Sequence, residues 1–309
     1  MNHRVVSSNK AKQKISIKIR EVILQRLLSG CPNLIVSLQD KITLGVVASG
    51  VHDRHVVQTI QFLSRELGFK DFFIDVGANI GTISCSLEGS FTSFFCYEPN
   101  KEVYQILNLN LNRNLLNSKY VTHNCGLDKE AGMQELVIPK SNVGGAFLNS
   151  KSNLLSRNAL AHKDNFVEIK EATHESRLVE VRSASSELLD ILKLFGEKSK
   201  GVIKVDVEGM DVTLVSEFLG ALPNSHQISF VFENHLTSEP LLRLENSLKR
   251  FNFELFKIEQ RRPWKQSDKT AWKFLKSLIG ETQIILTERN IKDQLEKGDY
   301  VLIVYTNEA

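Results

Sequence analysis

Short apolar runs alternate with amphipathic segments along the chain from Asp71 onward. Such runs, when turn-forming residues bound them, are typical of strands buried in a parallel sheet. We predict strands at 72–74, 94–97, 120–121, 202–205, 228–232, 253–256 and 300–305. Apolar residues at helical spacing predict one helix after Asn100 and another over 212–218. This alternation indicates βαβ units and therefore an α/β domain with a mostly parallel sheet.

Three segments fall outside the alternation. Residues 1–69 precede it and form a predicted N-terminal helical extension, in which apolar residues recur at helical spacing between Ile15 and Leu27. This basic helix either packs on the domain or anchors weakly to acidic membrane surfaces. Residues 140–176 are polar and predict a long loop. Residues 260–298 separate the last two predicted strands, and insertions of this length are often functional.

The composition is that of an ordinary globular protein and narrows the function classes. Of 309 residues, 42% are hydrophobic and 24% are charged, and the net charge of +3 is too small to indicate a nucleic-acid partner. The four cysteines form no pair at zinc-ligand spacing, which favours a reducing compartment. No stretch approaches the length of a transmembrane segment, and the N-terminus lacks a signal-peptide pattern. We therefore expect a cytoplasmic protein.

The strongest motif is the segment Asp75–Gly81, with the sequence D-V-G-A-N-I-G, directly after an apolar strand and before a helical pattern. Gly77 and Gly81 permit a sharp turn and the close approach of a ligand to the backbone. Glu98 stands at the end of the next strand, where a carboxylate can accept hydrogen bonds from two ribose hydroxyls. The turn lacks the G-x-G-x-x-G pattern of pyrophosphate binding, and Asp75 would repel a phosphate but attract a cation. S-Adenosylmethionine, a cationic nucleoside without phosphate, fits this turn better than NAD does; the alternative is a turn that binds no ligand.

Charged residues also follow two later strands. The segment Lys204–Gly209 reads K-V-D-V-E-G, and the segment Glu233–His235 ends the next strand with E-N-H. Charges at the end of a buried strand are costly unless they have a partner or a function. We expect both groups at the same sheet edge as Asp75 and Glu98. The alternative is that some of these acids cap helices or pair with Lys204.

These segments resemble the FkbM-type methyltransferase family. The resemblance rests on the Asp75–Gly81 turn, the segment Tyr97–Asn100, the K-x-D-x-E-G element, the strand that ends in Glu233, and repeated Leu-Asn pairs over 107–114. It covers residues 70–257 and implies a Rossmann-like class I methyltransferase fold within a domain spanning 70–309. That fold has a seven-stranded, mostly parallel sheet with helices on both faces.

The resemblance further implies that a methyl group passes from S-adenosyl-L-methionine to a hydroxyl of a sugar, a glycan or a related secondary metabolite. By the matched positions, the turn would line the methionine part of the cofactor, Glu98 would hold the ribose, and residues 124–126 would border the adenine. The cofactor-binding residues predicted in this way are Asp75, Gly77, Asn79, Gly81, Glu98, Asn124 and Gly126.

Methyl transfer from a sulfonium is an in-line displacement, so positioning supplies much of the catalysis. A hydroxyl acceptor must also lose its proton. The predicted catalytic residues are Asp206, Glu208, Glu233 and His235, among which histidine is the commonest general base in enzymes. A divalent-metal variant would instead hold Mg²⁺ through oxygen atoms of Asp206, Glu233 and Asn234.

Two other function classes stay open on the sequence alone. An NAD-dependent oxidoreductase would also explain Glu98, although the missing third glycine and Asp75 count against it. A non-catalytic S-adenosylmethionine-binding module would keep the fold without turnover. Comparing the binding of S-adenosylmethionine with that of NAD distinguishes a methyltransferase from an oxidoreductase. Formation of S-adenosylhomocysteine distinguishes an enzyme from a non-catalytic binding module.

The segment Arg261–Leu278, within the 260–298 insertion, is predicted to be a lid over the acceptor site. Six basic residues are interleaved there with Trp264, Trp272 and Phe274, against the single acid Asp268. Aromatic faces stack on sugar rings, and cations pair with acidic substituents of glycans. The alternatives are a surface helix whose aromatic residues pack inward and a site for single-stranded nucleic acid, which the modest net charge disfavours.

Overall fold

An eight-stranded sheet forms the centre of the computed structural model, which describes residues 18, 31–36, 43, 45–46, 50–155, 159–160, 169–235, 239–261, 282–292 and 296–305. The strands stand in the order β11 (Gln283–Glu288), β10 (Asn252–Arg261), β12 (Gly298–Tyr305), β9 (Gln227–Asn234), β8 (Lys200–Val205), β1 (Phe72–Val76), β2 (Ser93–Tyr97) and β3 (Lys119–His123). The five strands from β3 to β9 run parallel, whereas β12 is antiparallel to both of its neighbours. The sheet is therefore mostly parallel, as the alternation of strands and helices predicts.

The sheet has one strand more than the seven that the family resemblance implied. The additional strand is β11, which pairs antiparallel with β10 at the edge of the sheet. Its residues are exposed or only half-buried, so it shows no fully buried apolar run of the kind that predicts a strand. It lies within 260–298, and residues 262–281, which hold nearly all of the predicted lid, lie outside the described residues.

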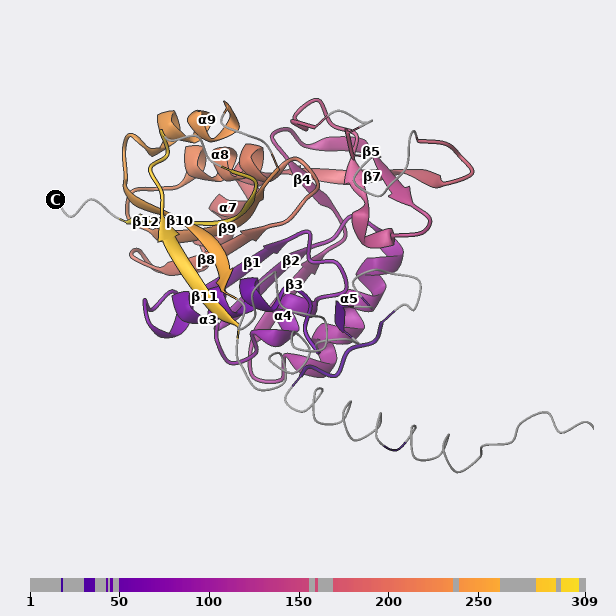
Figure 1. Ribbon diagram of the computed structural model, residues 1–309, viewed down its shortest axis with the longest axis horizontal. Helices are drawn as coiled ribbons and strands as arrows, with labels where there is room; N and C mark the ends of the chain where they lie inside the picture. The colour runs from indigo at the N-terminus through magenta and orange to yellow at the C-terminus, as the bar shows by residue number, and fades with distance from the viewer. Residues whose placement is uncertain are drawn as a thin grey trace, which may run out of the picture.

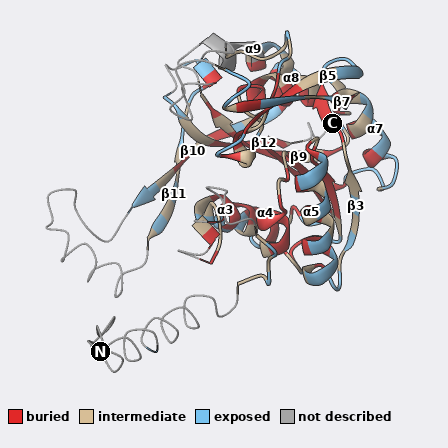
Figure 2. Ribbon diagram, turned by 90° about the vertical axis from the view of Figure 1, so that its right-hand side faces the viewer, coloured by how far each residue is buried: buried red, intermediate tan, exposed pale blue. Residues whose placement is uncertain are grey.

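Helices cover both faces of the sheet because successive strand residues point to opposite sides (Figure 1). Phe72, Ile74 and Val76 of β1 pack in one core cluster with α7 (Ala184–Leu192), α8 (Asp211–Ala221) and α9 (Glu239–Leu248). Phe73 packs on the other face with α3 (Arg54–Arg65), α4 (Thr82–Ser86) and α5 (Lys101–Asn114). Figure 2 shows the buried residues gathered along the sheet and the inner sides of these helices. None of the helices in the described ranges has the length and apolar character that a membrane crossing requires.

The described end of the predicted N-terminal extension is part of the domain core. Ile60 and Leu63 of α3 are fully buried in the cluster that contains Phe73. The predicted amphipathic helix between Ile15 and Leu27 lies outside the described residues apart from Lys18. Helix α3 therefore packs as an integral element of the sheet's lower face in Figure 1.

The Leu-Asn pattern of α5 has a structural explanation. The Leu107 and Leu111 side chains pack into the core, while Asn110, fully buried, bonds to two backbone segments. Its amide nitrogen donates to the carbonyl oxygens of Ile80 at 2.7 Å and Ile35 at 3.0 Å, and its oxygen accepts from the Ile35 N–H at 2.6 Å. Asn110 thus ties the segment 31–36 to the turn that follows β1.

A second, four-stranded sheet stands beside the first and was not predicted. It contains β4 (Gly126–Asp128), β7 (His174–Ser183), β5 (Gly132–Pro139) and β6 (Phe147–Leu148), with the 3-10 helix η1 (Val143–Gly145) before β6. The predicted loop at 140–176 therefore contains a short helix, a short strand and the start of β7. Most of β7 is exposed or half-buried, and β4 and β6 are only three and two residues long. These three strands therefore lack the long apolar run from which a buried strand is predicted. Leu127, Leu136 and Leu148 of this sheet join the main core.

Candidate active site

A cavity of about 280 Å³ opens at the carboxyl ends of β1, β2, β8 and β9. This is the edge at which open α/β sheets bind ligands, and the volume is near the lower end for small-molecule sites. The sequence-predicted residues that line it are Gly77, Asn79, Glu98, Gly126, Asp206, Glu208 and Glu233. The fold therefore brings residues from five separate segments, all singled out from the sequence, to one cavity.

The turn after β1 is held between two neighbouring strand ends. Gly77 has a φ of 76°, in the left-handed region, and its N–H donates to the Tyr97 carbonyl oxygen at 3.1 Å. A Cβ at this position would collide with the carbonyl oxygen of Asp206. Gly81, with a φ of 82°, caps α4, and a Cβ there would lie 2.8 Å from Leu107. Both glycines are required by backbone shape and close packing.

Glu98 is fixed by the turn that it faces. Its two carboxylate oxygens accept the N–H groups of Asn79 at 3.1 Å and Asn100 at 2.8 Å. Asn79 itself is left-handed, with a φ of 50°. Burial raises the pKa of Glu98 to about 7, although the two backbone donors act in the opposite direction. The carboxylate is thus oriented into the cavity with lone pairs remaining for a ligand.

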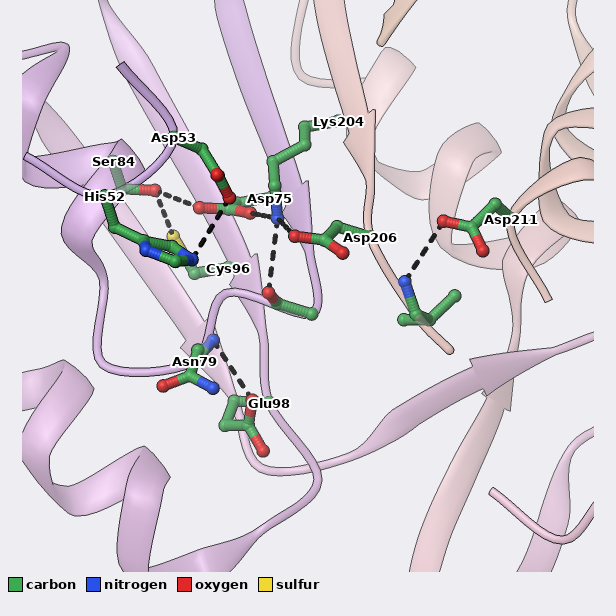
Figure 3. Close-up of polar contacts among 12 residues, drawn as sticks. His52, Asp53, Asp75, Asn79, Ser84, Cys96, Glu98, Lys204, Asp206 and Asp211 are labelled. Carbon is green, nitrogen blue, oxygen red and sulfur yellow. Dashed lines mark hydrogen bonds and ion pairs between the residues drawn. The ribbon is translucent and has the colours of Figure 1, made fainter. Parts of the chain in front are cut away.

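Asp75 lies behind the turn and forms a buried ion pair (Figure 3). Its carboxylate accepts from Ser84 Oγ at 2.6 Å and from Lys204 Nζ at 3.1 Å, and both charged side chains are almost fully buried. Lys204 also lies 3.2 Å from Asp206, and the two carboxylates raise its pKa against the effect of burial. The sequence predicted that Asp75 meets a cationic ligand directly; in the structure its cationic partner is Lys204, and Asp75 is not among the described residues lining the cavity.

The β8 end is braced by the loop that follows β6. Gly209 has a φ of 81°, and a Cβ there would collide with the Asn153 side chain. The Asn153 amide donates to the Glu208 carbonyl oxygen at 2.9 Å. This contact holds the turn that presents Asp206 and Glu208 to the cavity.

The β9 end presents only the first of its three predicted residues to the cavity. Glu233 lines it, and its carboxylate lies 3.2 Å from His235 Nδ1. The other ring nitrogen of His235 lies 3.6 Å from the buried carboxylate of Asp211, whose pKa burial raises well above the usual range. His235 lies between two carboxylates, outside the described lining of the cavity.

The FkbM methyltransferase domain matches residues 75–262, from the turn after β1 to the end of β10. The chain belongs to the FkbM methyltransferase family. It is therefore a methyltransferase that uses S-adenosylmethionine, built on a Rossmann-like α/β fold with eight strands in the main sheet.

Solved structures resemble this FkbM methyltransferase only distantly. Precorrin-6y C5,15-methyltransferase from Geobacter metallireducens GS-15 aligns at 10% identity and a TM-score of 0.40, over 89% of this chain and 95% of that one. Magnesium protoporphyrin IX methyltransferase from Synechocystis PCC 6803, with bound SAM, aligns at 8% identity and a TM-score of 0.39, over 98% and 100%. No curated protein matches the sequence.

Two predicted cofactor residues in this methyltransferase differ in their contacts. Gly126, at the start of β4, lines the cavity, and a Cβ there would lie 2.9 Å from Leu148. The Asn124 amide instead donates to the carbonyl oxygens of Glu98 at 2.9 Å and Pro99 at 3.1 Å. Asn124 thus supports the loop that carries Glu98.

The residues proposed for Mg²⁺ do not form a ligand set. Asn234 is fully buried, and its amide donates to the Glu296 carbonyl oxygen at 3.2 Å. Asp206 is paired with Lys204. Within the described ranges, no group of three His, Cys, Asp or Glu side chains has metal-binding geometry. These residues therefore do not fit a magnesium site.

The structure also brings residues to the cavity that the sequence did not single out. His52 and Asp53, just before α3, line it from the N-terminal side. Leu136, Phe147 and Leu148 form an apolar wall from the second sheet. An aspartate before a helical pattern is a helix-start signal, but no local signal places it at the edge of a sheet whose first strand begins only at Phe72.

Proposed function

We propose that this methyltransferase transfers the methyl group of S-adenosylmethionine to a hydroxyl of a sugar, a glycan or a related secondary metabolite. The observation that carries the proposal is the set of carboxylates, Asp206, Glu208 and Glu233, which line the cavity beyond Glu98. Carboxylates accept hydrogen bonds from several hydroxyl groups at once and can take a proton from one of them. When bound, S-adenosylmethionine supplies an electrophilic methyl group on a sulfonium.

The residues around the cavity fit this cofactor. Gly77 and Asn79 leave the backbone of the turn accessible, and the oriented carboxylate of Glu98 matches two ribose hydroxyls. We assign the adenine to the part of the cavity beside Gly126 and Leu127, where apolar side chains of the second sheet form the wall. The cationic sulfonium is compatible with the acidic residues that follow β8 and β9.

The remaining predicted cofactor residues act from behind the cavity in this proposal. Asp75 holds Lys204 in place, Gly81 permits the start of α4, and Asn124 holds the backbone of Glu98. For His235 we propose contact with Glu233, which orients that carboxylate, in place of direct contact with the acceptor.

A labelled-methyl assay tests the proposal. Purified protein with methyl-labelled S-adenosylmethionine should label sugars and hydroxylated metabolites, whereas acceptors that offer only amines should stay unlabelled. Glu233→Gln and Glu208→Gln should lower turnover more than they lower cofactor affinity, because both side chains are proposed to contact the acceptor. Labelling of amines alone, with hydroxylated acceptors unlabelled, would contradict O-methylation.

A further inference from the structure

A second cavity, of about 200 Å³, adjoins the first. Five residues line both cavities: Asp53, Ile83, Lys204, Asp206 and Glu233. The far side of the second cavity is formed by α3, β9 and Asp299 at the start of β12. A ligand there would be separated from a cofactor in the first cavity only by these shared side chains.

Asp53 stands at this boundary in an unusual conformation. Its backbone is left-handed, with φ 47° and ψ 51°, although it is not a glycine. It occupies the N-cap position of α3, yet its carboxylate accepts no capping hydrogen bond from that helix, all of whose residues are described. An aspartate at an N-cap ordinarily accepts a backbone N–H and stabilises the helix. Non-glycine residues in the left-handed region are uncommon and cluster at active sites and ligand-binding sites.

The Asp53 carboxylate has a defined neighbour in His52, which also lines the first cavity. His52 Nε2 lies 3.1 Å from Asp53 Oδ2 (Figure 3). The His52 ring has room because residue 45 is a glycine: a Cβ at Gly45 would lie 2.9 Å from His52 Nδ1. The imidazole therefore supports one carboxylate oxygen of Asp53.

The other two carboxylates at the boundary are held differently. Asp206 lies 3.2 Å from the Lys204 ammonium and forms an ion pair with it. Glu233 contacts His235, which is shared with Asp211. Burial raises the pKa of Asp53, as does the Asp206 carboxylate, while His52, His55 and Lys204 act in the opposite direction. A raised pKa makes a carboxylate a better general base.

We propose that Asp53 accepts the proton of the acceptor hydroxyl and that the second cavity holds the acceptor. The proposal rests on the proposed O-methyltransferase function. In the transfer, the acceptor oxygen forms a bond to the methyl carbon, the carbon–sulfur bond breaks with its electron pair left on sulfur, and the hydroxyl proton goes to the Asp53 carboxylate. Asp53 lies outside the matched domain at 75–262, so this role belongs to the N-terminal segment of the present chain.

Sinefungin tests the position of Asp53 without a known acceptor. In this analogue an amine-bearing carbon replaces the methylsulfonium of S-adenosylmethionine, so its ammonium group marks the place of the transferred methyl. Asp53→Asn keeps the shape and suits a left-handed backbone, since asparagine tolerates that region. We expect calorimetry to show sinefungin affinity at least about tenfold weaker in Asp53→Asn, because a charge-assisted contact is lost. S-Adenosylhomocysteine affinity should stay within about twofold, because that ligand carries no charge at this place.

Matched variants make the result specific. Glu98→Gln should weaken both ligands by the same factor, since both carry the ribose. The wild type is compared first for its affinities toward sinefungin and S-adenosylhomocysteine. If a tighter binding of sinefungin disappears in Glu233→Gln and persists in Asp53→Asn, then Glu233 and not Asp53 faces the transferred methyl group, and the proposal is overturned. The proposal would also fail if Asp53→Asn bound both ligands as the wild type does. Either outcome leaves O-methylation itself standing, because that function is tested by the class of acceptor labelled.

Discussion

At the scale of single residues, the proposed cofactor site depends most on Glu98. Its carboxylate has a pKa raised by burial to about 7, so it is largely protonated at pH 6 and largely ionised at pH 8. The ionised form accepts both backbone N–H groups, and in our proposal it also accepts the ribose hydroxyls. Cofactor binding should therefore strengthen as the pH rises through 7.

The pH dependence can be measured with S-adenosylhomocysteine. If only the ionised form binds, the ionised fraction rises about tenfold between pH 6 and pH 8, and the association constant should rise by about the same factor. Glu98→Gln should bind more weakly at pH 8 and show a flatter profile. A wild-type affinity that falls over this range would remove Glu98 from the cofactor site.

Lys204 supports a second prediction at the same scale. It is the buried cation between Asp75 and Asp206, and removing it leaves Asp75 buried without its ammonium partner. Lys204→Met should therefore lower the free energy of unfolding by about 3–5 kcal/mol, measured by urea denaturation. The matched control is Lys193→Met at the C-cap of α7, where the ion pair with Asp190 is exposed and should contribute less than about 1 kcal/mol. Equal effects in the two variants would show that the buried pair is not structural.

Sequence patterns predicted which residues belong to the site, but they did not predict which of these residues contact one another. Asp75 and Lys204 were both singled out, and pairing of the acids with Lys204 was one of two readings. The choice between them depends on β1 lying beside β8, where Asp75 and Lys204 are register partners 129 residues apart. Local sequence patterns do not show that β1 pairs with β8. The same reason explains why Asp53 and His52 were missed.

At the scale of elements, the turn after β1 can be tested with a pair of glycines. Gly77 and Gly68 have the same φ of 76°, but a Cβ at Gly77 would collide with the Asp206 carbonyl oxygen, whereas at Gly68 it would meet nothing within 4 Å. Gly68→Ala should cost only backbone strain, about 1–2 kcal/mol. Gly77→Ala should cost more, and it should also weaken cofactor binding because the turn must move away from β8.

Urea unfolding and calorimetry of the two alanine variants check this prediction. Equal losses of stability, with cofactor affinity unchanged in both, would show that the turn has room to adapt. The comparison is informative because the two positions share one backbone conformation and differ in packing.

Strand prediction succeeded where both faces of a strand are covered. All seven predicted strands are present, and five of them, β1, β2, β8, β9 and β12, are almost continuously buried because helices cover both faces of the main sheet. β7 and β11 escaped prediction because most of their residues are exposed or half-buried, and β4 and β6 because they are only three and two residues long. Their presence is a consequence of tertiary packing: β5 and β7 become stable only against each other and the core.

At the scale of the whole molecule, the fold gathers four distant segments at one sheet edge. The segments after β1, β2, β8 and β9 supply Gly77, Glu98, Asp206 and Glu233, and the chain before α3 adds Asp53. The second sheet contributes the apolar residues Leu136, Phe147 and Leu148 to the cavity wall, where we propose that the adenine binds. The part of the cavity where we propose that the acceptor binds is therefore polar, and the part where we propose that the adenine binds is apolar.

The central claim is that this cavity binds S-adenosylmethionine and not a dinucleotide. Isothermal titration calorimetry of the purified chain with S-adenosylmethionine, and separately with NAD, tests it most directly. We expect saturable binding of one S-adenosylmethionine per chain and no detectable heat from NAD at the same concentrations, because the turn after β1 lacks the third glycine of the pyrophosphate-binding pattern. Saturable binding of NAD with none of S-adenosylmethionine would contradict the account.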